Sequence, residues 1–255
     1  MAHLITAQNE LHGLHDLLGL ILHKGAANGN YLELLDCLLT IPFAQSSWQR
    51  YCRFKDEFLK VGGEIARIGW EKVTRVYTNE SDRHTKPSYL GRLIAYPDRP
   101  RNAKGVSPGL NQINKITTEL AKKPGYSNLS FVFLRPADLH DQVRPGYVPC
   151  AIAGDFKFRD GQFHMNVMFR TSDAFAVAYG DVYYLRQLQI KVLTQAQNQT
   201  AHIALRDGRV GNLTLYFCRS YIERSRKVRM KGRSSSKRVK IIPLAEALIS
   251  RIESY

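Results

Sequence analysis

A chain of 255 residues can bury a substantial core and is most simply one domain, although two small ones would also fit. Its hydrophobic content of 44% and aromatic content of 10% are those of an ordinary globular protein. No apolar run reaches the roughly 18 residues of a membrane span, and no basic region precedes the first apolar stretch. We therefore expect neither a membrane helix nor a signal peptide.

The sequence has four cysteines, Cys37, Cys52, Cys150 and Cys218. They form neither a C-x-x-C pair nor a dense disulfide framework, so we expect a reduced, cytoplasmic protein. Each thiol is then available either to fill the core or to act as a nucleophile. His12 and His15 share a helical face, but a pair without a third ligand rarely binds zinc, and we predict no metal site.

The net charge of +15 is concentrated near the C-terminus. Residues 219–240 contain ten lysines and arginines against one acid, Glu223, which leaves this basic segment with a net charge of +9. Such a segment attracts polyphosphates and nucleic acid through its electric field. A solvated surface loop without a specific partner is the alternative, and the sequence does not choose between them.

Hydrophobic spacing predicts helices over residues 2–23, 31–39 and 48–60. Residues 82–108 are rich in proline, arginine and lysine, which indicates irregular structure. A helix with one apolar stripe is expected over residues 110–120, and Pro124 with Gly125 ends it.

The second half of the chain mixes strands and helices. A buried strand is predicted over residues 129–134, and a hairpin over residues 150–158 and 162–170 that turns at Asp160 and Gly161. A long helix follows over residues 176–193, then a second hairpin turning at Asp207 and Gly208, and a closing helix over residues 243–252. Without regular βαβ alternation, the fold class is α+β, a mixed sheet flanked by helices.

Several short segments follow one another in a fixed order along the middle of the chain. They are N-Q-I-N-K-I-T-T-E-L-A-K-K-P from Asn111, L-R-P-A-D-L from Leu134, V-P-C ending at Cys150, F-R-T-S-D-A-F from Phe169, and G-N-L-T-L-Y ending at Tyr216. In order and spacing they resemble the pyrimidine-methylating core of thymidylate synthase and its hydroxymethylating relatives. The resemblance implies one thymidylate-synthase-like domain, with a divergent part (1–105), a recognisable core (106–218) and the basic segment (219–240).

The resemblance also implies roles for individual residues. Cys150 would add as a thiolate to C6 of a pyrimidine, which makes C5 nucleophilic. Arg170 would lower the thiol pKa and grip the substrate phosphate, helped by the hydroxyl of Thr171 or Ser172. Asp173 would contact the folate ring of methylenetetrahydrofolate, the one-carbon donor.

Asp181 lies 31 residues after Cys150, at the family's spacing for the residue that reads the base. Thymidylate synthases carry Asn there, which matches uracil, whereas a carboxylate accepts a hydrogen bond from the amino group of cytosine. Deoxycytidylate hydroxymethylase, a relative, carries Asp there. The implied substrate is therefore CMP or dCMP, unless Asp181 merely caps the long helix.

Sugar and general-base residues are less well matched. Tyr216 would hydrogen-bond the sugar, and Thr214 stands where the family usually has His. Glu64 lies nearest the expected distance of the general-base glutamate, with Glu57 second; an exposed helical glutamate is the alternative for both.

The matches and mismatches to the family leave two hypotheses about function. The family's S-R-R motif reads S-N-L at residues 127–129, which removes two charge-assisted phosphate contacts of about 1.5–3 kcal/mol each. One hypothesis is a homodimeric, folate-dependent C5 hydroxymethyltransferase or methyltransferase of nucleotide biosynthesis. The other is a scaffold that has lost catalysis and binds nucleic acid through residues 219–240. A hybrid, in which the base is presented within a polynucleotide, is compatible with both.

Overall fold

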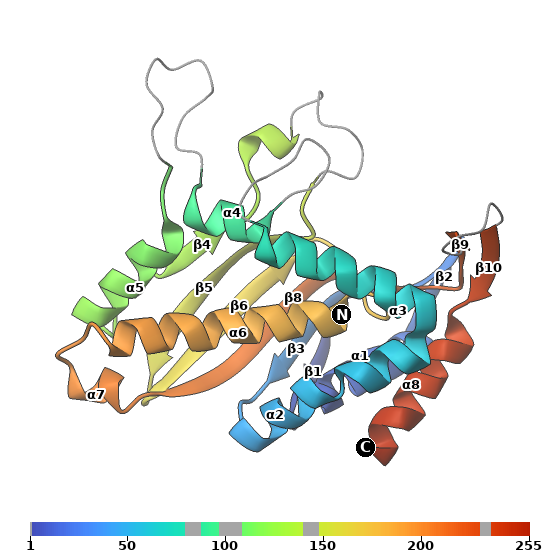
Figure 1. Ribbon diagram of the computed structural model, residues 1–255, viewed down its shortest axis with the longest axis horizontal. Helices are drawn as coiled ribbons and strands as arrows, with labels where there is room; N and C mark the ends of the chain where they lie inside the picture. The colour runs from blue at the N-terminus through green and yellow to red at the C-terminus, as the bar shows by residue number, and fades with distance from the viewer. Residues whose placement is uncertain (1, 80–87, 97–108, 140–147, 230–235) are drawn as a thin grey trace. The chain divides into compact units, whose positions relative to one another are not determined.

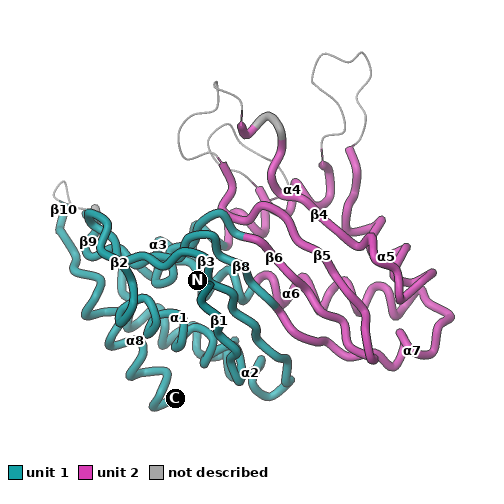
Figure 2. Tube along the Cα trace, turned by 180° about the vertical axis from the view of Figure 1, so that it is seen from behind, with its two compact units in different colours: residues 1–73, 169–183, 214–255 teal, residues 74–168, 184–213 magenta. Residues whose placement is uncertain are grey.

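The structure is a computed structural model that describes residues 2–79, 88–96, 109–139, 148–229 and 236–255. It is a mixed α/β fold in which a mixed sheet is flanked by helices (Figure 1). Contacts divide the chain into two compact units, each built from separate stretches (Figure 2). Unit 1 comprises residues 1–73, 169–183 and 214–255, and unit 2 comprises residues 74–168 and 184–213.

Unit 1 contains the N-terminal and C-terminal elements. They are β1 (His3–Thr6), α1 (Glu10–Lys24), β2 (Ala26–Asn28), β3 (Tyr31–Ile41), α2 (Gln45–Arg53), most of α3 (Lys55–Thr78), β7 (Ser172–Asp173), the start of α6 (Ala178–Gln197), the end of β8 (Arg209–Glu223), β9 (Ser225–Arg229), β10 (Ser236–Lys240) and α8 (Ile242–Ser254). Strand β3 pairs in parallel with β1 and antiparallel with β2, and it neighbours β8. Helix α1 packs against β3 and lies beside α8 (Figure 1).

Unit 2 contains the remaining helices and strands. Its elements are the end of α3, α4 (Tyr89–Ile94), α5 (Gln112–Lys122), β4 (Ser130–Val132), the 3-10 turn η1 (Pro136–Leu139), β5 (Ala151–Arg159), β6 (Gln162–Phe169), most of α6, α7 (Ile203–Arg206) and the start of β8. The strands follow the order β8-β6-β5-β4, and β4 runs antiparallel to β5. Both α4 and α5 pack against β4.

The core of unit 1 joins α2, α3 and the start of α6 through Tyr179. Its ring stacks on Tyr51 and on Phe58, with ring centroids 4.6 Å apart in each case. The Tyr51 hydroxyl donates to the Tyr179 carbonyl (2.8 Å), and the Tyr179 hydroxyl donates to the Tyr51 carbonyl (2.7 Å). Because both phenols are buried and paired with backbone, they add specific geometry to a large apolar contact.

The core of unit 2 is a run of phenylalanines between β4, β5 and β6. Phe131 contacts Phe156 at 5.2 Å between ring centroids, and Phe156 stacks on Phe163 at 5.0 Å. These rings are fully buried, as the alternating pattern of the predicted hairpin requires. Two buried polar side chains of α6, Arg186 and Gln189, bond each other and donate to carbonyls of the β6–β8 pair.

Most predicted elements of the second half are present. The strand within residues 129–134, the hairpin of β5 and β6, the long helix and the closing helix are confirmed by β4, β5, β6, α6 and α8. The helix at residues 110–120 is confirmed by α5, whose first turn is capped by the Asn111 side chain accepting from the Asn114 N–H (2.9 Å). The thymidylate-synthase-like fold itself stays a prediction.

Three expectations about secondary structure are wrong. The helix predicted at residues 31–39 is strand β3, because this leucine-rich run pairs on both sides, which outweighs its helical spacing. The N-terminal helix starts only at Glu10, after β1 and an Asn9 cap that accepts from two backbone N–H groups. The hairpin predicted to turn at Asp207 and Gly208 is instead the short helix α7 followed by β8.

Two further expectations are tested only in part. Within residues 82–108, predicted to be irregular, the structure describes α4, and residues 82–87 and 97–108 lie outside the described chain. The basic segment forms the end of β8 and the strands β9 and β10 rather than a loop, with residues 230–235 not described. None of the helices described is long and apolar enough to cross a bilayer.

Replacing Gly69 by alanine is expected to destabilise the protein. A Cβ atom at Gly69 would lie 1.9 Å from the carbonyl oxygen of Ala176, and a backbone atom cannot move aside as a side chain can. We expect a loss of about 1–3 kcal/mol in the free energy of unfolding, measured by urea denaturation.

Gly19→Ala in α1 is the matched control, because nothing lies within 4 Å of its Cβ position. It should stabilise the protein by about 0.5–1 kcal/mol through helix propensity. Equal stabilities of the two variants would contradict the described packing of α3.

Candidate functional site

The site residues expected from the sequence divide between the two units. Cys150 belongs to unit 2. The remaining expected residues belong to unit 1: Glu64, Arg170, Thr171, Ser172, Asp173, Asp181, Thr214 and Tyr216.

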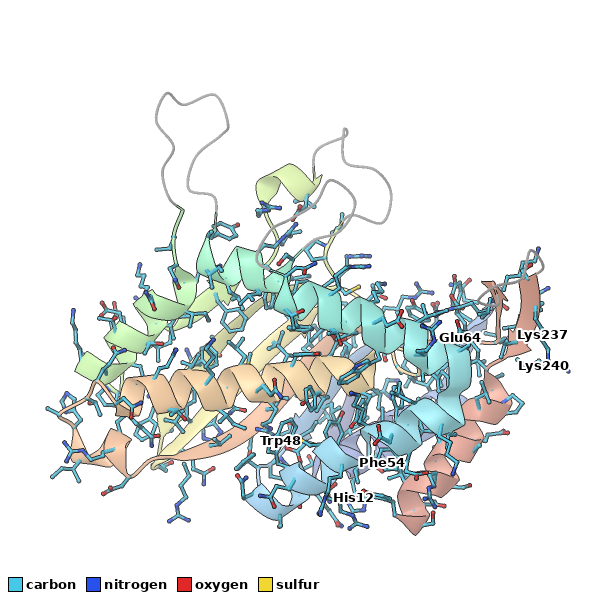
Figure 3. All side chains as sticks on the ribbon, in the orientation of Figure 1. His12, Trp48, Phe54, Glu64, Lys237 and Lys240 are labelled. Carbon is cyan, nitrogen blue, oxygen red and sulfur yellow. The ribbon has the colours of Figure 1, made fainter. Side chains whose placement is uncertain are left out.

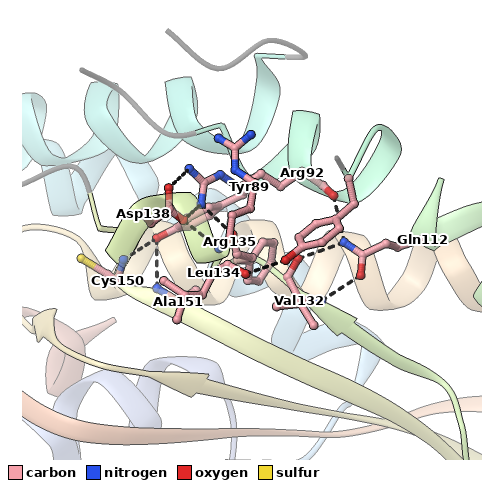
Figure 4. Close-up of polar contacts among 11 residues, drawn as sticks. Tyr89, Arg92, Gln112, Val132, Leu134, Arg135, Asp138, Cys150 and Ala151 are labelled. Carbon is pink, nitrogen blue, oxygen red and sulfur yellow. Dashed lines mark hydrogen bonds and ion pairs between the residues drawn. The ribbon is translucent and has the colours of Figure 1, made fainter. Parts of the chain in front are cut away.

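Cys150 directly precedes β5, and its thiol is half-buried rather than enclosed in the core. Its backbone N–H donates to the Tyr89 hydroxyl at 3.1 Å, and the N–H of Ala151 donates to the same oxygen at 3.1 Å (Figure 4). Tyr89 begins α4, which is capped by the Ser88 hydroxyl accepting from the Gly91 N–H. One buried phenol thus fixes the backbone that carries the thiol.

A buried ion pair lies one helical turn further along α4. The Arg92 guanidinium donates to both carboxylate oxygens of Asp138, at 2.5 and 3.0 Å, and also to the carbonyl of Phe133 (Figure 4). Both side chains are almost completely buried. A pair at this depth is tolerated only with well-formed geometry and further hydrogen bonds. Asp138 has one, because it also accepts from the Arg135 N–H at 2.8 Å.

Gln112 ties this pair to the sheet. Its amide nitrogen donates to the carbonyls of Arg92 (2.8 Å) and Val132 (2.9 Å), and its amide oxygen accepts from the Val132 N–H (2.8 Å). Gln112, Asp138 and Cys150 come from three of the segments that carry the family resemblance. Unit 2 joins all three segments to α4 by hydrogen bonds of buried side chains (Figure 4).

The expected phosphate-binding residues of unit 1 follow β6. Arg170 is exposed, whereas the hydroxyl oxygens of Thr171 and Ser172 are buried and have no hydrogen-bond partner in the described part of the chain. Ser172 pairs directly opposite Ser220 of β8, whose buried hydroxyl also has no partner there. An unpaired buried hydroxyl costs about 1–3 kcal/mol, so these three hydroxyls have hydrogen-bonding capacity that the described residues do not fill.

Asp173, the expected folate contact, is tied into its own unit. One carboxylate oxygen accepts from the Ala176 N–H (3.0 Å), and the other accepts from the guanidinium of Arg226 (2.5 Å). Arg226 also pairs with Glu223. Burial raises the pKa of Asp173, although the charge of Arg226 opposes the shift. Sequence reasoning missed Arg226 because it appeared only as one charge of the basic segment.

Asp181 is the fourth residue of α6 and is 5% exposed. Its N–H already donates to the Val177 carbonyl, so it lies inside the helix rather than at the N-cap, and the capping alternative is wrong. A buried carboxylate in the first turn is favoured by the helix dipole. Its position is therefore electrostatically tolerable without a capping role.

The expected sugar-binding residues lie on β8. The Tyr216 hydroxyl donates to the Asp36 carboxylate at 2.7 Å, and this hydrogen bond raises the pKa of Tyr216. Thr214 lies two residues earlier, on the same face of the strand. Both side chains are half-buried, and the Tyr216 oxygen can still accept a hydrogen bond.

The glutamate candidates for the general base both form ion pairs. Glu64 lies on α3 (Figure 3), directly after Gly63, whose positive φ of 54° kinks the helix. Its carboxylate pairs with Arg67. Glu57 accepts from Arg251 at 2.9 Å. The described contacts thus assign both carboxylates to surface pairs and add nothing specific to the choice of Glu64.

The other cysteines and the histidine pair have structural surroundings. Burial raises the pKa of Cys37, which is buried, and of Cys52, which is half-buried, to about 11 in each case. His15 bonds Asp16 and Glu253, and His12 bonds Asn9. No cluster of three potential metal ligands occurs in the ranges that the structure describes.

Thiol alkylation should separate the cysteines of the folded protein. At about pH 8 only about one thiol in a thousand of Cys37 and Cys52 is ionised, because each pKa is near 11 and only the thiolate reacts. Iodoacetamide followed by peptide mass spectrometry should label Cys150 and spare both. Labelling of Cys37 as fast as Cys150 would contradict the described burial.

Tyr89→Phe should disturb Cys150 without removing any packing. It leaves two backbone N–H groups without their acceptor, which should cost about 1–3 kcal/mol in the free energy of unfolding and change the alkylation rate of Cys150. Tyr184→Phe is the control, because its hydroxyl bonds Thr74 instead. An unchanged Cys150 rate in Tyr89→Phe would show that the phenol does not position the thiol.

No protein-family model matches this sequence, and no curated protein is significantly similar to it. The family resemblance therefore depends on the motifs themselves and on the contacts that their residues make. Function is inferred from the chemistry of the two residue sets.

Proposed function

We propose that this protein is a folate-dependent transferase that modifies C5 of a cytidine nucleotide through Cys150. The observation that carries the proposal is the framework of unit 2, in which residues from three separated motif segments all bond to α4: Gln112 and Asp138 to Arg92, and the N–H of Cys150 to Tyr89. These buried hydrogen bonds bring together segments that are far apart in the sequence, which supports treating them as one framework.

The chemistry assigned to Cys150 begins with addition of its thiolate to C6 of the pyrimidine. The C5=C6 electron pair then moves to C5, which attacks the one-carbon unit, and the C5 proton is taken by a base. Departure of tetrahydrofolate would then leave an exocyclic methylene at C5, water would add to this methylene, and elimination of the thiolate would restore the double bond and the free enzyme. Methylenetetrahydrofolate supplies the carbon; with water as the other reactant, the products are the 5-hydroxymethyl nucleotide and tetrahydrofolate.

The proposed cytosine preference depends on Asp181. Its carboxylate is buried, so it would interact with a base in a medium of low dielectric, where a mismatched donor or acceptor is expensive. The exocyclic amine of cytosine offers a donor to that carboxylate, whereas O4 of uracil offers only an acceptor. Cytosine is therefore the base that this side chain favours.

Phosphate binding is assigned to Arg170 with Thr171 and Ser172. The exposed guanidinium supplies charge, and the two buried hydroxyls have free hydrogen-bonding capacity within the described chain. These donors would take the role of the family's arginine pair, which the sequence lacks at residues 127–129. The folate ring would meet Asp173, whose oxygens each accept one internal bond and retain a second lone pair. The proposal includes the family's homodimer.

The direct test is tritium release from C5-tritiated dCMP or CMP in the presence of methylenetetrahydrofolate. Wild-type protein should release tritium, Cys150→Ala should not, and Cys218→Ala, which removes another half-buried thiol, should behave as wild type. Asp181→Asn should shift the preference from cytosine toward uracil by about tenfold to a hundredfold, the value of one charge-assisted hydrogen bond.

Three results would contradict the proposal. Tritium release that persists in Cys150→Ala would show that Cys150 is not the nucleophile. An unchanged base preference in Asp181→Asn would show that Asp181 does not read the base. Absence of release with every pyrimidine nucleotide would favour the non-catalytic scaffold.

A further inference from the structure

The strands β9 and β10 form a separate two-stranded ribbon in unit 1. Every ionisable side chain in the two strands is a lysine or an arginine. The antiparallel register places Lys227 directly opposite Arg238, a pair of like charges that weakens the ribbon. A two-stranded sheet is already marginal by itself, so this repulsion serves no purpose in the stability of the free protein.

The alternation of side chains sorts the basic residues of the ribbon into two groups. Arg226 is half-buried and bonds Asp173 and Glu223, which anchors β9 to the segment that carries Thr171 and Ser172. On the opposite face Lys227, Arg238 and Lys240 are exposed, and the described chain offers none of them a carboxylate partner. Figure 3 shows Lys240 on the ribbon. Lys237, which lies opposite Val228 on the other face, is exposed as well, so three of the four exposed cations described in the ribbon lie on one face.

This exposed face suits a polyanion more than a lipid surface. A helix or ribbon that binds a bilayer combines basic residues with apolar side chains that enter the lipid. In the ribbon Val228 is buried and Val239 is half-buried, so no exposed apolar side chain accompanies the cations. Successive phosphates of a nucleic acid need only the charges.

We propose that the exposed face of the β9–β10 ribbon binds a single-stranded polynucleotide, and that the pyrimidine modified by this enzyme lies within that polymer. The inference rests on the proposed function and specifies its substrate class. A base stacked in a duplex hides C6 from a nucleophile, whereas a single strand exposes it. The ribbon supplies backbone contacts that compensate for the missing arginine pair, and its Arg226 anchor links these contacts to the phosphate-binding segment.

The binding test uses a fluorescein-labelled oligodeoxycytidylate and fluorescence anisotropy over a salt series. The ribbon variant is Lys227→Gln, Arg238→Gln, Lys240→Gln, and the control removes the same charge from exposed helical lysines with Lys72→Gln, Lys115→Gln, Lys191→Gln. With about 0.7 counterions released per phosphate contact, three lost contacts should lower the slope of log K against log salt by about 2. Affinity at about 0.1 M salt should then fall about a hundredfold, while the control stays close to wild type.

Thermal unfolding separates loss of binding from loss of fold. Removing the Lys227–Arg238 repulsion should leave the Tm of the ribbon variant equal to or above that of wild type. Unchanged affinity in the ribbon variant would overturn the inference. So would tighter binding to duplex DNA than to the single strand, or equally tight, ribbon-dependent binding to anionic phospholipid vesicles.

Tritium release distinguishes this inference from the function beneath it. Release from tritiated oligodeoxycytidylate that is reduced in the ribbon variant supports a polymer substrate. Release from dCMP but not from the oligomer overturns the polymer substrate and leaves the proposed function intact. Release from neither rejects the proposed function and the polymer substrate with it, and the anisotropy result alone then decides whether the ribbon binds nucleic acid.

Discussion

The double hydrogen bond from the N–H groups of Cys150 and Ala151 to the Tyr89 hydroxyl is the contact on which the functional account depends. It places a half-buried thiol at the start of a sheet strand, on a backbone held by a side chain from a different part of the sequence. The Arg92–Asp138 pair and Gln112 add further hydrogen bonds, and Gln112 connects α4 to β4. Because a buried ion pair of this kind adds little net stability, its value lies in the unique geometry that it enforces.

Unit 1 presents the complementary constraint, an excess of hydrogen-bonding capacity. The buried hydroxyls of Thr171, Ser172 and Ser220 lack partners in the described ranges, whereas each carboxylate oxygen of Asp173 next to them already accepts one hydrogen bond, from Arg226 or from Ala176. An anion held by Arg170 and these hydroxyls would remove the imbalance. The same Arg226 anchors a basic ribbon, so the proposed binding of one phosphate and the proposed binding of a polymer would depend on one connected set of side chains.

The sequence predicted those elements whose pattern is local. The Asp160–Gly161 turn and the alternation of Phe163 and Met165 specify the β5–β6 hairpin without tertiary information, because both arise from neighbouring residues. The helix predicted at residues 31–39 was wrong for the opposite reason. A leucine-rich run fits helical spacing as readily as strand spacing, and only pairing with β1 and β2 makes this run a strand. The candidate site, too, was predictable only where its pattern is local. Motif order selected Cys150 and the segment that contains Asp138, but their link to Tyr89 and Arg92 depends on contacts between distant segments.

The central claim is that Cys150 bonds covalently to a pyrimidine ring during turnover. The most direct measurement incubates the protein with 5-fluoro-dCMP and methylenetetrahydrofolate and maps the adduct by peptide mass spectrometry, since fluorine at C5 cannot leave as a proton does. The account predicts a stable adduct on the peptide that contains Cys150, absent from Cys150→Ala. An adduct on Cys37, Cys52 or Cys218, or bound nucleotide without any covalent adduct, would contradict it.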